Sequence, residues 1–251
     1  MVNDANTPRH LLLLAGSGEA RVLAERLALQ GQMRVTASLL TTPRSFGALA
    51  IPTRVGAFGG KDGQARYLRD QRITAVLDAT HPFADRISAQ TAEVCAELGL
   101  PYAQVLRPDW QPTAADHWQE VASEAAAAAL LTSGQQVFTT TGRATLDGLV
   151  RNRAAQFFVR QMEPRNDEAS RPNVTYISGK GPFSVADEIE TLRALNIDVL
   201  VVKNSGGVPS RTKLDAARAL GIKVILIARP PLLDVRRLET VKAALDWIDA
   251  L

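Results

Sequence analysis

The sequence predicts an α/β protein with two Rossmann-like, doubly wound domains, mainly parallel sheets and an interdomain cleft. Three observations lead to this fold class. Apolar segments of strand length alternate with helical patterns almost from end to end, which is typical of parallel strands joined by helical crossovers. A proline-containing stretch at 107–112 interrupts this alternation. Polar and glycine-rich residues follow several apolar strands, at the edge where open α/β sheets bind ligands.

The first half of the chain predicts five strands and three helices. The apolar run at 10–15 is a buried strand, and Val22, Leu23 and Leu27 then recur at helical spacing until Gly31 ends the helix. The same alternation continues to residue 106. The predicted strands are 10–15, 33–40, 53–58, 73–77 and 102–106, and the predicted helices are 19–30, 64–71 and 82–98.

The domain boundary is predicted just after Pro112. Two prolines within 107–112 are incompatible with a helix interior or a central strand. We therefore expect an N-terminal dinucleotide-binding domain at 1–112 and a C-terminal domain at 113–251. The second domain predicts strands at 136–140, 155–162, 173–177, 199–203 and 223–228, and helices at 123–131, 182–195, 213–220 and 235–250.

Composition narrows the class of protein. The 251 residues are 46% hydrophobic and 22% charged, as in an ordinary globular protein. A net charge of +3 and 5% aromatic residues do not favour nucleic-acid binding. One cysteine and three histidines predict neither a disulfide framework nor a metal site. An apolar signal core and a membrane-length run are both missing, so we expect a cytoplasmic protein whose oligomeric state stays open, a monomer being compatible with the sequence.

The first strand leads into Gly16, Ser17, Gly18 and Glu19 at the start of a helix. Glycines let the backbone approach a phosphate, and a helix N-terminus supplies amide donors. The pattern is half of the dinucleotide fingerprint, because Arg21 stands where its third glycine would fall. A tight turn with Ser17 as a helix cap is an equally good interpretation.

Thr41, Thr42 and Arg44 follow the second strand, and no carboxylate is near them. Enzymes that use NAD place an acidic residue there for the ribose hydroxyls, whereas arginine and hydroxyl side chains accommodate the additional phosphate of NADP. This favours NADPH as the cofactor. The alternative is that Arg44 is a solvated cation in a loop.

The segment 78–84 follows the buried strand at 73–77. We expect Pro82 to occupy the first turn of the next helix, which leaves Thr80 and His81 pointing into a crevice. His81 has two candidate roles, because its ordinary pKa near neutrality suits a general acid and its ring nitrogens suit ligand binding. A binding role is the preferred interpretation.

Three further polar segments follow strands of the second half. Each offers anion-binding groups, since arginine has a planar fork, lysine a point charge and glycine-rich backbone a nest of amides. The alternative is that Lys203 and Arg229 neutralise helix ends or pair with Asp215 and Asp234. The candidate residues in these segments are Thr140, Thr141 and Arg143, then Lys203, Ser205, Gly206 and Gly207, and finally Arg229.

These motifs together resemble the precorrin-6A reductase family of cobalamin (vitamin B12) biosynthesis. The resemblance runs over nearly the whole chain, and six motifs in the same order make it specific. Asn204 departs from the aspartate that the family commonly has, which bears on any role for a charge there. The six motifs are 16–20, 78–84, 140–143, 181–184, 203–207 and 229–230.

The resemblance implies a Rossmann-like oxidoreductase that transfers hydride from NADPH to a ring double bond of precorrin-6A, giving precorrin-6B. The protein's task would be to orient the reactants, exclude water and hold anions, since the cofactor carries the chemistry. No catalytic side chain is certain, and His81 is the candidate. The expected cofactor-binding residues are Gly16, Ser17, Gly18, Glu19, Thr42, Arg44, Thr80, Lys203, Ser205 and Gly206, and the expected substrate-binding residues are His81, Thr140, Arg143 and Arg229.

Alternatives remain. The 203–207 segment is either a phosphate cradle for the cofactor or part of the substrate site. Reduction of the cobalt-containing substrate of the anaerobic branch uses the same fold and chemistry. If the protein is a non-catalytic binder of an anionic ligand, it should not consume NADPH. If it is a transferase with an adenosyl cofactor, we would expect an acidic residue after the second strand, which this chain lacks.

Overall fold

The computed structural model divides the chain into two compact units. The first unit is Met1–Arg107 together with Pro230–Leu251, and the second is Pro108–Arg229. The structure describes residues 9–42, 47–142, 145–150, 154–162, 171–179 and 181–251.

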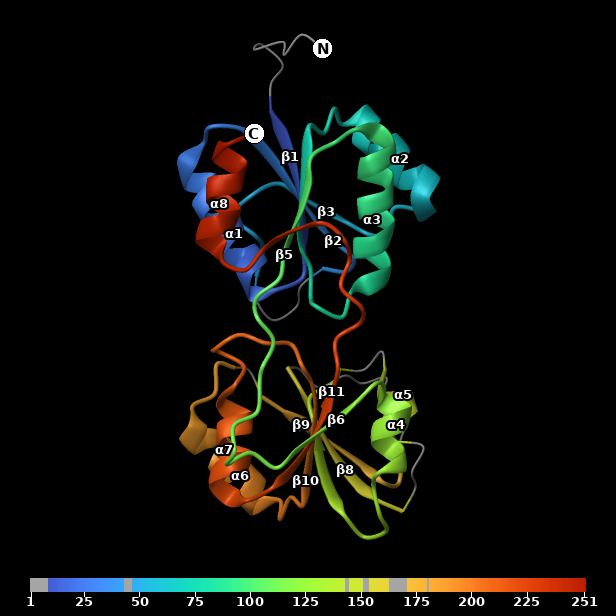
Figure 1. Cartoon of the computed structure of the whole chain (residues 1–251), viewed down its shortest axis with the longest axis vertical. Helices are drawn as coiled ribbons and strands as arrows, with labels where there is room; N and C mark the ends of the chain where they lie inside the picture. The colour runs from blue at the N-terminus through green and yellow to red at the C-terminus, as the bar shows by residue number, and fades with distance from the viewer. Residues whose placement is uncertain (1–8, 43–46, 143–144, 151–153, 163–170, 180) are drawn as a thin grey trace. The chain divides into compact units, whose positions relative to one another are not determined.

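The first unit is a six-stranded sheet in the order β12-β5-β4-β1-β2-β3. Every neighbouring pair of strands is parallel. Helices α1 and α8 cover one face of this sheet, and α2 and α3 cover the other (Figure 1). The strands are β1 (His10–Ala15), β2 (Arg34–Leu39), β3 (Thr53–Val55), β4 (Ala75–Ala79), β5 (Tyr102–Val105) and β12 (Arg236–Leu238), and the helices are α1 (Gly18–Gln30), α2 (Gly60–Asp70), α3 (Asp85–Leu98) and α8 (Val241–Asp249).

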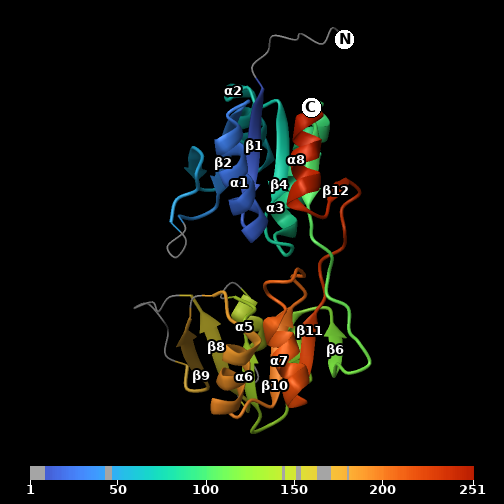
Figure 2. The same ribbon diagram turned by 90° about the vertical axis from the view of Figure 1, so that its left-hand side faces the viewer.

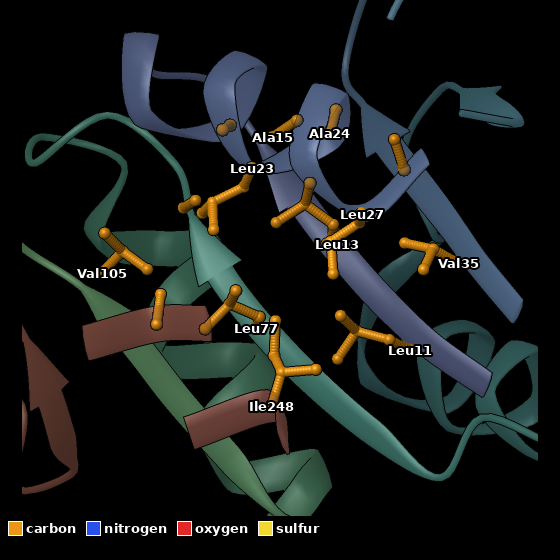
Figure 3. Close-up of a cluster of buried hydrophobic side chains, with 14 of the residues drawn as sticks. Leu11, Leu13, Ala15, Leu23, Ala24, Leu27, Val35, Leu77, Val105 and Ile248 are labelled. Carbon is orange, nitrogen blue, oxygen red and sulfur yellow. The ribbon is translucent and has the colours of Figure 1, made fainter. Parts of the chain in front are cut away.

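The core of the first unit lies on both faces of β1, because successive side chains of a strand point to opposite faces. Leu11 and Leu13 pack on one face against Leu23 and Ile248 of the covering helices (Figure 3). Leu12 and Leu14 pack on the other face, in a cluster that includes Cys95. Burial on both faces explains why β1 has a continuous apolar sequence rather than an alternating one. Burial, together with the nearby charge of Asp78, raises the pKa of the Cys95 thiol to about 12.

The second unit repeats this plan with a six-stranded sheet in the order β6-β11-β10-β7-β8-β9. Its neighbouring strands are again parallel. Figure 2 shows this sheet with α6 and α7 on the near face. The strands are β6 (Trp118–Val121), β7 (Gln136–Thr139), β8 (Gln156–Gln161), β9 (Val174–Ser178), β10 (Val199–Lys203) and β11 (Lys223–Ile227), and the helices are α4 (Glu124–Ala129), α5 (Leu146–Leu149), α6 (Val185–Ala194) and α7 (Thr212–Leu220).

The end of the chain differs from the expected division at 1–112 and 113–251, because residues 230–251 belong to the first unit. Within this segment, β12 pairs with β5 through Leu238 and Val105, and Trp247 joins the first core. The helix expected at 235–250 begins only at Val241, where the Thr240 side chain accepts a hydrogen bond from the Ala243 amide as the N-cap. The preceding residues form the strand.

The structure also differs from the prediction at residues 78–84, which follow the buried strand. Strand β4 continues through Asp78 to Ala79, so this carboxylate lies within the strand rather than after it. Pro82 lies in a turn, and α3 begins at Asp85, which places the proline before the helix and not in its first turn. The amide of Ala84 closes the turn by donating to the carbonyl of His81 over 2.8 Å.

Within the described ranges, no helix is both long and apolar enough to cross a bilayer. The same residues contain no group of three or more His, Cys, Asp or Glu side chains arranged to hold a metal ion.

Candidate functional site

Each sheet has one topological switch point, where the strand order reverses. In the first sheet β1 lies between β4 and β2, and in the second β7 lies between β10 and β8. Ligands of open α/β sheets bind at the carboxyl ends of the strands at such points. The loops that follow β1 and β4, and those that follow β7 and β10, are therefore the candidate site segments of the two units.

The loop after β1 approaches the turn after β4 very closely. A Cβ built on Gly16 would lie 3.2 Å from the His81 amide nitrogen and 3.3 Å from the Thr80 Cα. Gly18 has no atom within 4 Å of such a Cβ, so the space beside it is open. The structure thus brings together Gly16, Thr80 and His81, which the sequence predicted separately.

The Ser17 side chain is the N-cap of α1. Its hydroxyl accepts a hydrogen bond from the Ala20 amide (3.2 Å) and donates one to the Ala79 carbonyl (2.8 Å). The capping interpretation of Ser17 is therefore confirmed, and the same side chain connects β4 to the loop after β1. Contacts from this loop to a phosphate would come from backbone amides at the helix N-terminus.

Glu19 forms an ion pair with Arg107, and 2.6 Å separate the Glu19 Oε2 and Arg107 Nη1 atoms. Both side chains are largely buried, with 24% and 15% of their surfaces exposed. A carboxylate at the start of α1 would repel a phosphate, and the guanidinium offsets that charge. The sequence indicated Glu19 but not Arg107, because the pairing joins distant parts of the chain.

Asp78 is a fully buried carboxylate that orients the turn after β4. Its Oδ1 accepts a hydrogen bond from the Thr80 amide (3.0 Å), and its Oδ2 accepts one from the Tyr102 hydroxyl (2.8 Å). Burial and the charge of Asp78 raise the pKa of Tyr102, which keeps the phenol protonated as a donor. Asp78 therefore positions Thr80, and with it the His81 backbone beside Gly16.

The geometry of His81 defines the tautomer of its neutral ring. The Phe83 amide donates a hydrogen bond to His81 Nδ1 over 3.3 Å. Because Nδ1 accepts, the proton of a neutral imidazole lies on Nε2. A partly buried His81 thus carries a hydrogen-bond donor at Nε2.

The residues after β2 are only partly described. Thr42 is exposed, whereas Arg44 lies outside the described residues. Arg143, from the second unit, also lies outside them. The roles expected for these three residues stay predictions.

In the second unit, a threonine pair shapes the loop after β7. The hydroxyls of Thr139 and Thr141 are 3.1 Å apart, and the Thr141 amide donates to the Thr139 hydroxyl over 3.3 Å. Both side chains are buried, while Thr140 is partly exposed. The turn then passes through Gly142 at a φ of 82°, a conformation that favours glycine.

Lys203, at the end of β10, is held by two side chains from other elements. Its ammonium lies 3.0 Å from the Glu124 carboxylate and donates a 3.0 Å hydrogen bond to the Thr145 hydroxyl. Burial raises the pKa of Glu124, but hydrogen bonds from Thr145 and Lys203 outweigh this effect and leave the pKa below its ordinary value. Pairing with Asp215, one alternative for Lys203, is not what the structure shows: Asp215 pairs with Arg211.

Asn204 is buried and binds the backbone of Trp110 at both ends of its amide. The Asn204 Oδ1 accepts from the Trp110 amide (2.8 Å), and its Nδ2 donates to the Trp110 carbonyl (3.1 Å). An aspartate could accept but not donate, so this arrangement requires the amide. The Trp110 indole in turn donates to the Gly207 carbonyl over 2.7 Å. Asn204 therefore has a structural role in this chain, because it holds the Trp110 backbone.

The Arg229 side chain binds the backbone of the loop after β10. Its Nε and Nη2 atoms donate to the carbonyls of Asn204 (2.8 Å) and Ser205 (3.1 Å). A Cβ on Gly206 would clash with this guanidinium and with the Pro108 carbonyl, and the φ of Gly206 is 67°. Gly206 is thus needed for close packing of the loop.

Taken together, two doubly wound units and a glycine-rich loop at the first switch point are typical of a class, the α/β enzymes that bind a nucleotide. The sequence over residues 10–249 matches the model of the family described as Precorrin-6x reductase CbiJ/CobK. The chain belongs to this family and is an oxidoreductase. The family-level prediction from the sequence motifs is confirmed.

Individual proteins support the same assignment. The chain is 41% identical to a precorrin-6A reductase of Rhodococcus erythropolis, covering 96% of this chain and 98% of the relative. It is 30% identical to a cobalt-precorrin-6A reductase of Priestia megaterium, over 88% and 90% of the two chains. A solved structure described as CobK precorrin-6A reductase superposes with a TM-score of 0.89 at 34% identity, over 96% of each chain. The predicted fold of two Rossmann-like units is thereby confirmed.

Proposed function

We propose that this reductase uses NADPH to reduce a ring double bond of precorrin-6A, giving precorrin-6B in cobalamin biosynthesis. The observation that carries the proposal is family membership over residues 10–249, together with 41% identity to a precorrin-6A reductase across 96% of the chain. A reductase of this family implies a nicotinamide cofactor. That the cofactor is NADPH, and which residues bind it, are parts of the proposal.

The first switch point suits the dinucleotide. The 13-residue helix α1 begins directly after Gly16 and Ser17, and the space beside Gly18 is open. The amides at the start of α1 would bind the pyrophosphate, and Arg107 offsets the charge of Glu19 beside them. When bound, the cofactor supplies the hydride.

His81 and Thr80 would orient the reacting groups. Asp78 fixes the turn that carries them, so their positions are set before any ligand binds. His81 donates from Nε2 in its neutral form, which suits a hydrogen bond to a carbonyl or carboxylate oxygen. We assign His81 a binding role. The loops of the second unit, considered by themselves, offer amides and partly exposed side chains that suit carboxylates, Thr140 among them.

The decisive experiment is anaerobic incubation of the purified protein with NADPH and precorrin-6A, following the absorbance of both cofactor and macrocycle. We expect NADPH oxidation to match macrocycle reduction in stoichiometry. Binding of the macrocycle without NADPH oxidation would contradict the proposal and favour a non-catalytic binder. His81→Ala serves as a second test: an unchanged kcat with a higher KM supports the binding role.

A second candidate substrate is cobalt-precorrin-6A, since cobalt-precorrin-6A reductases are also relatives, at 30% identity. The higher identity to precorrin-6A reductases favours the metal-free macrocycle. Comparing kcat/KM for the two macrocycles under identical anaerobic conditions decides between them. A cytoplasmic location is a further part of the proposal, and cell fractionation tests it.

A further inference from the structure

Arg54 lies at the edge of the first sheet where the second strand ends. It belongs to β3, and its backbone pairs with that of Ser38 in β2, next to the last residue of each strand. The two strands are parallel, so both residues lie at the carboxyl edge of the sheet, on the side of the strands from which the glycine-rich loop and the Thr80 turn also emerge. Arg54 belongs to none of the sequence motifs described above.

Hydrogen bonds and aromatic rings fix the Arg54 guanidinium. Its Nη1 donates to the Ser38 hydroxyl over 2.7 Å, and its Nη2 donates to the Ala57 carbonyl over 3.1 Å. The guanidinium carbon lies 4.0 Å from the ring centre of Phe58 and 5.1 Å from that of Tyr67. A guanidinium has five N–H donors in a rigid fork, and these two hydrogen bonds use two of them. Little side-chain entropy is left to lose when an anion binds.

The position matters because of what the end of β2 does in dinucleotide-binding folds. An acidic residue there binds the ribose hydroxyls of NAD, and a nearby arginine accommodates the 2′-phosphate of NADP. Here β2 ends at Leu39, and Leu40, Thr41 and Thr42 follow without a carboxylate. The fixed, partly buried guanidinium of Arg54 lies beside this strand end, where an arginine would accommodate the 2′-phosphate of NADP.

We propose that Arg54 selects NADPH over NADH by binding the 2′-phosphate of the cofactor, a role that is compatible with the one predicted for Arg44. Ser38 orients the guanidinium, and the rings of Phe58 and Tyr67 hold it in plane. This inference rests on the proposed function, since it concerns the cofactor assigned there. A purely structural Arg54, which only fastens the edge strand to the loop before α2, is the competing explanation.

Ligand fragments separate the two explanations without a turnover assay. Isothermal titration calorimetry would compare 2′,5′-ADP, which carries the 2′-phosphate, with 5′-ADP, which lacks it. We expect Arg54→Met to weaken binding of 2′,5′-ADP by about 10- to 100-fold, the value of charge-assisted hydrogen bonds to an anion, and binding of 5′-ADP by less than about threefold. Arg69→Met, at an exposed position of α2, is the matched control for loss of one positive charge and should leave both affinities unchanged.

Arg54→Lys covers the case in which the methionine variant fails to fold. Lysine keeps the charge but loses the planar fork, so a selective loss of 2′,5′-ADP affinity is again expected, smaller than that of the methionine variant. An equal loss for both fragments, or full retention of 2′,5′-ADP binding in a folded Arg54 variant, would overturn the assignment. The wild-type protein tests the proposed function separately. If it binds the two fragments with equal affinity, the assignment of NADPH as the cofactor is wrong, whatever the Arg54 variants show.

Discussion

Glycines and backbone amides form the loop after β1 in the first unit, whereas charged side chains surround the loop after β10 in the second unit. In the first loop, the Ser17 hydroxyl caps a helix and Gly18 borders open space. In the second, Lys203 pairs with Glu124, and Arg229 donates to two loop carbonyls. The comparison teaches that charge in a sequence motif is not the same as charge offered to a ligand.

The difference between the loops predicts unequal responses to added methyl groups. Gly206→Ala would place a Cβ against Pro108 and Arg229 at a positive φ, so we expect the second unit to lose about 2–4 kcal/mol of unfolding free energy. Gly221 has nearly the same φ, 66°, but no atom within 4 Å of a Cβ. Gly221→Ala should therefore show only the strain, about 1–2 kcal/mol. Urea unfolding measures both, and equal losses would show that the close packing around Gly206 is unimportant.

The first loop depends instead on one buried carboxylate. Tyr102→Phe removes a hydrogen bond to the fully buried Asp78, which should cost the first unit about 1–3 kcal/mol and weaken dinucleotide binding through the Thr80 turn. Thermal melts and calorimetric titration with NADPH would measure the two effects. Tyr176→Phe removes a tyrosine hydroxyl from β9 of the second unit instead, and it is the control that should leave NADPH affinity unchanged. Unchanged NADPH affinity in a destabilised Tyr102→Phe protein would show that the network does not position the turn.

The Lys203 pair tests whether charges of the second loop are already compensated. Glu124→Gln should cost about 1–2 kcal/mol of stability, because 15% and 16% exposure of the two side chains leaves little solvent screening. The same change should raise affinity for an anionic macrocycle by removing the negative charge that compensates the ammonium. Asp246→Asn breaks an ion pair with Lys242 whose side chains are 61% and 84% exposed, and should cost less than about 0.5 kcal/mol. Equal costs for the two variants would mean that Glu124 is no more important than a surface charge.

The smallest effect concerns acid stability of the second unit. Desolvation raises the pKa of Asp116, but hydrogen bonds from Arg218 and Thr113 have the larger, opposite effect. The net result is a pKa lowered from 3.8 to about 2. A carboxyl whose pKa is lowered by folding contributes stability above pH 3.8 that is lost as the pH falls toward 2. Asp116→Asn should therefore flatten the acid side of the stability profile. In a Trp247→Phe background, tryptophan fluorescence reports the second unit alone, since Trp110 and Trp118 both lie there; an unaltered profile would exclude this role for Asp116.

Much of the fold could be predicted from apolar runs, because a parallel strand covered on both faces is apolar throughout. The sequences of β1 and β10 are of this kind. Strand β6 was not predicted, since this edge strand has a half-exposed, partly charged sequence. Strand β12 was included in a helix because Leu238 lies at helical core spacing from Val241 and Leu245 of α8. Local periodicity cannot show which distant strand accepts an edge strand.

The sequence predicted which loops form the candidate site, but not which distant residues contact those loops. The sequence located the loops after β1, β4, β7 and β10, because glycine and polar residues end each apolar run. It did not indicate Arg107, Glu124 or Trp110, whose roles come from contacts with residues far away in the chain. The substrate-binding role of Arg229 stays a prediction, and the structure adds that two of its donors bind loop carbonyls.

The return of the chain to the first unit has a consequence for biosynthesis. A ribosome completes residues 108–229 before it makes β12 and α8, so the inserted unit can fold while the surrounding one still lacks an edge strand and a covering helix. Until Pro230–Leu251 emerge, the apolar surface that Trp247 and Ile248 later cover stays accessible to chaperones.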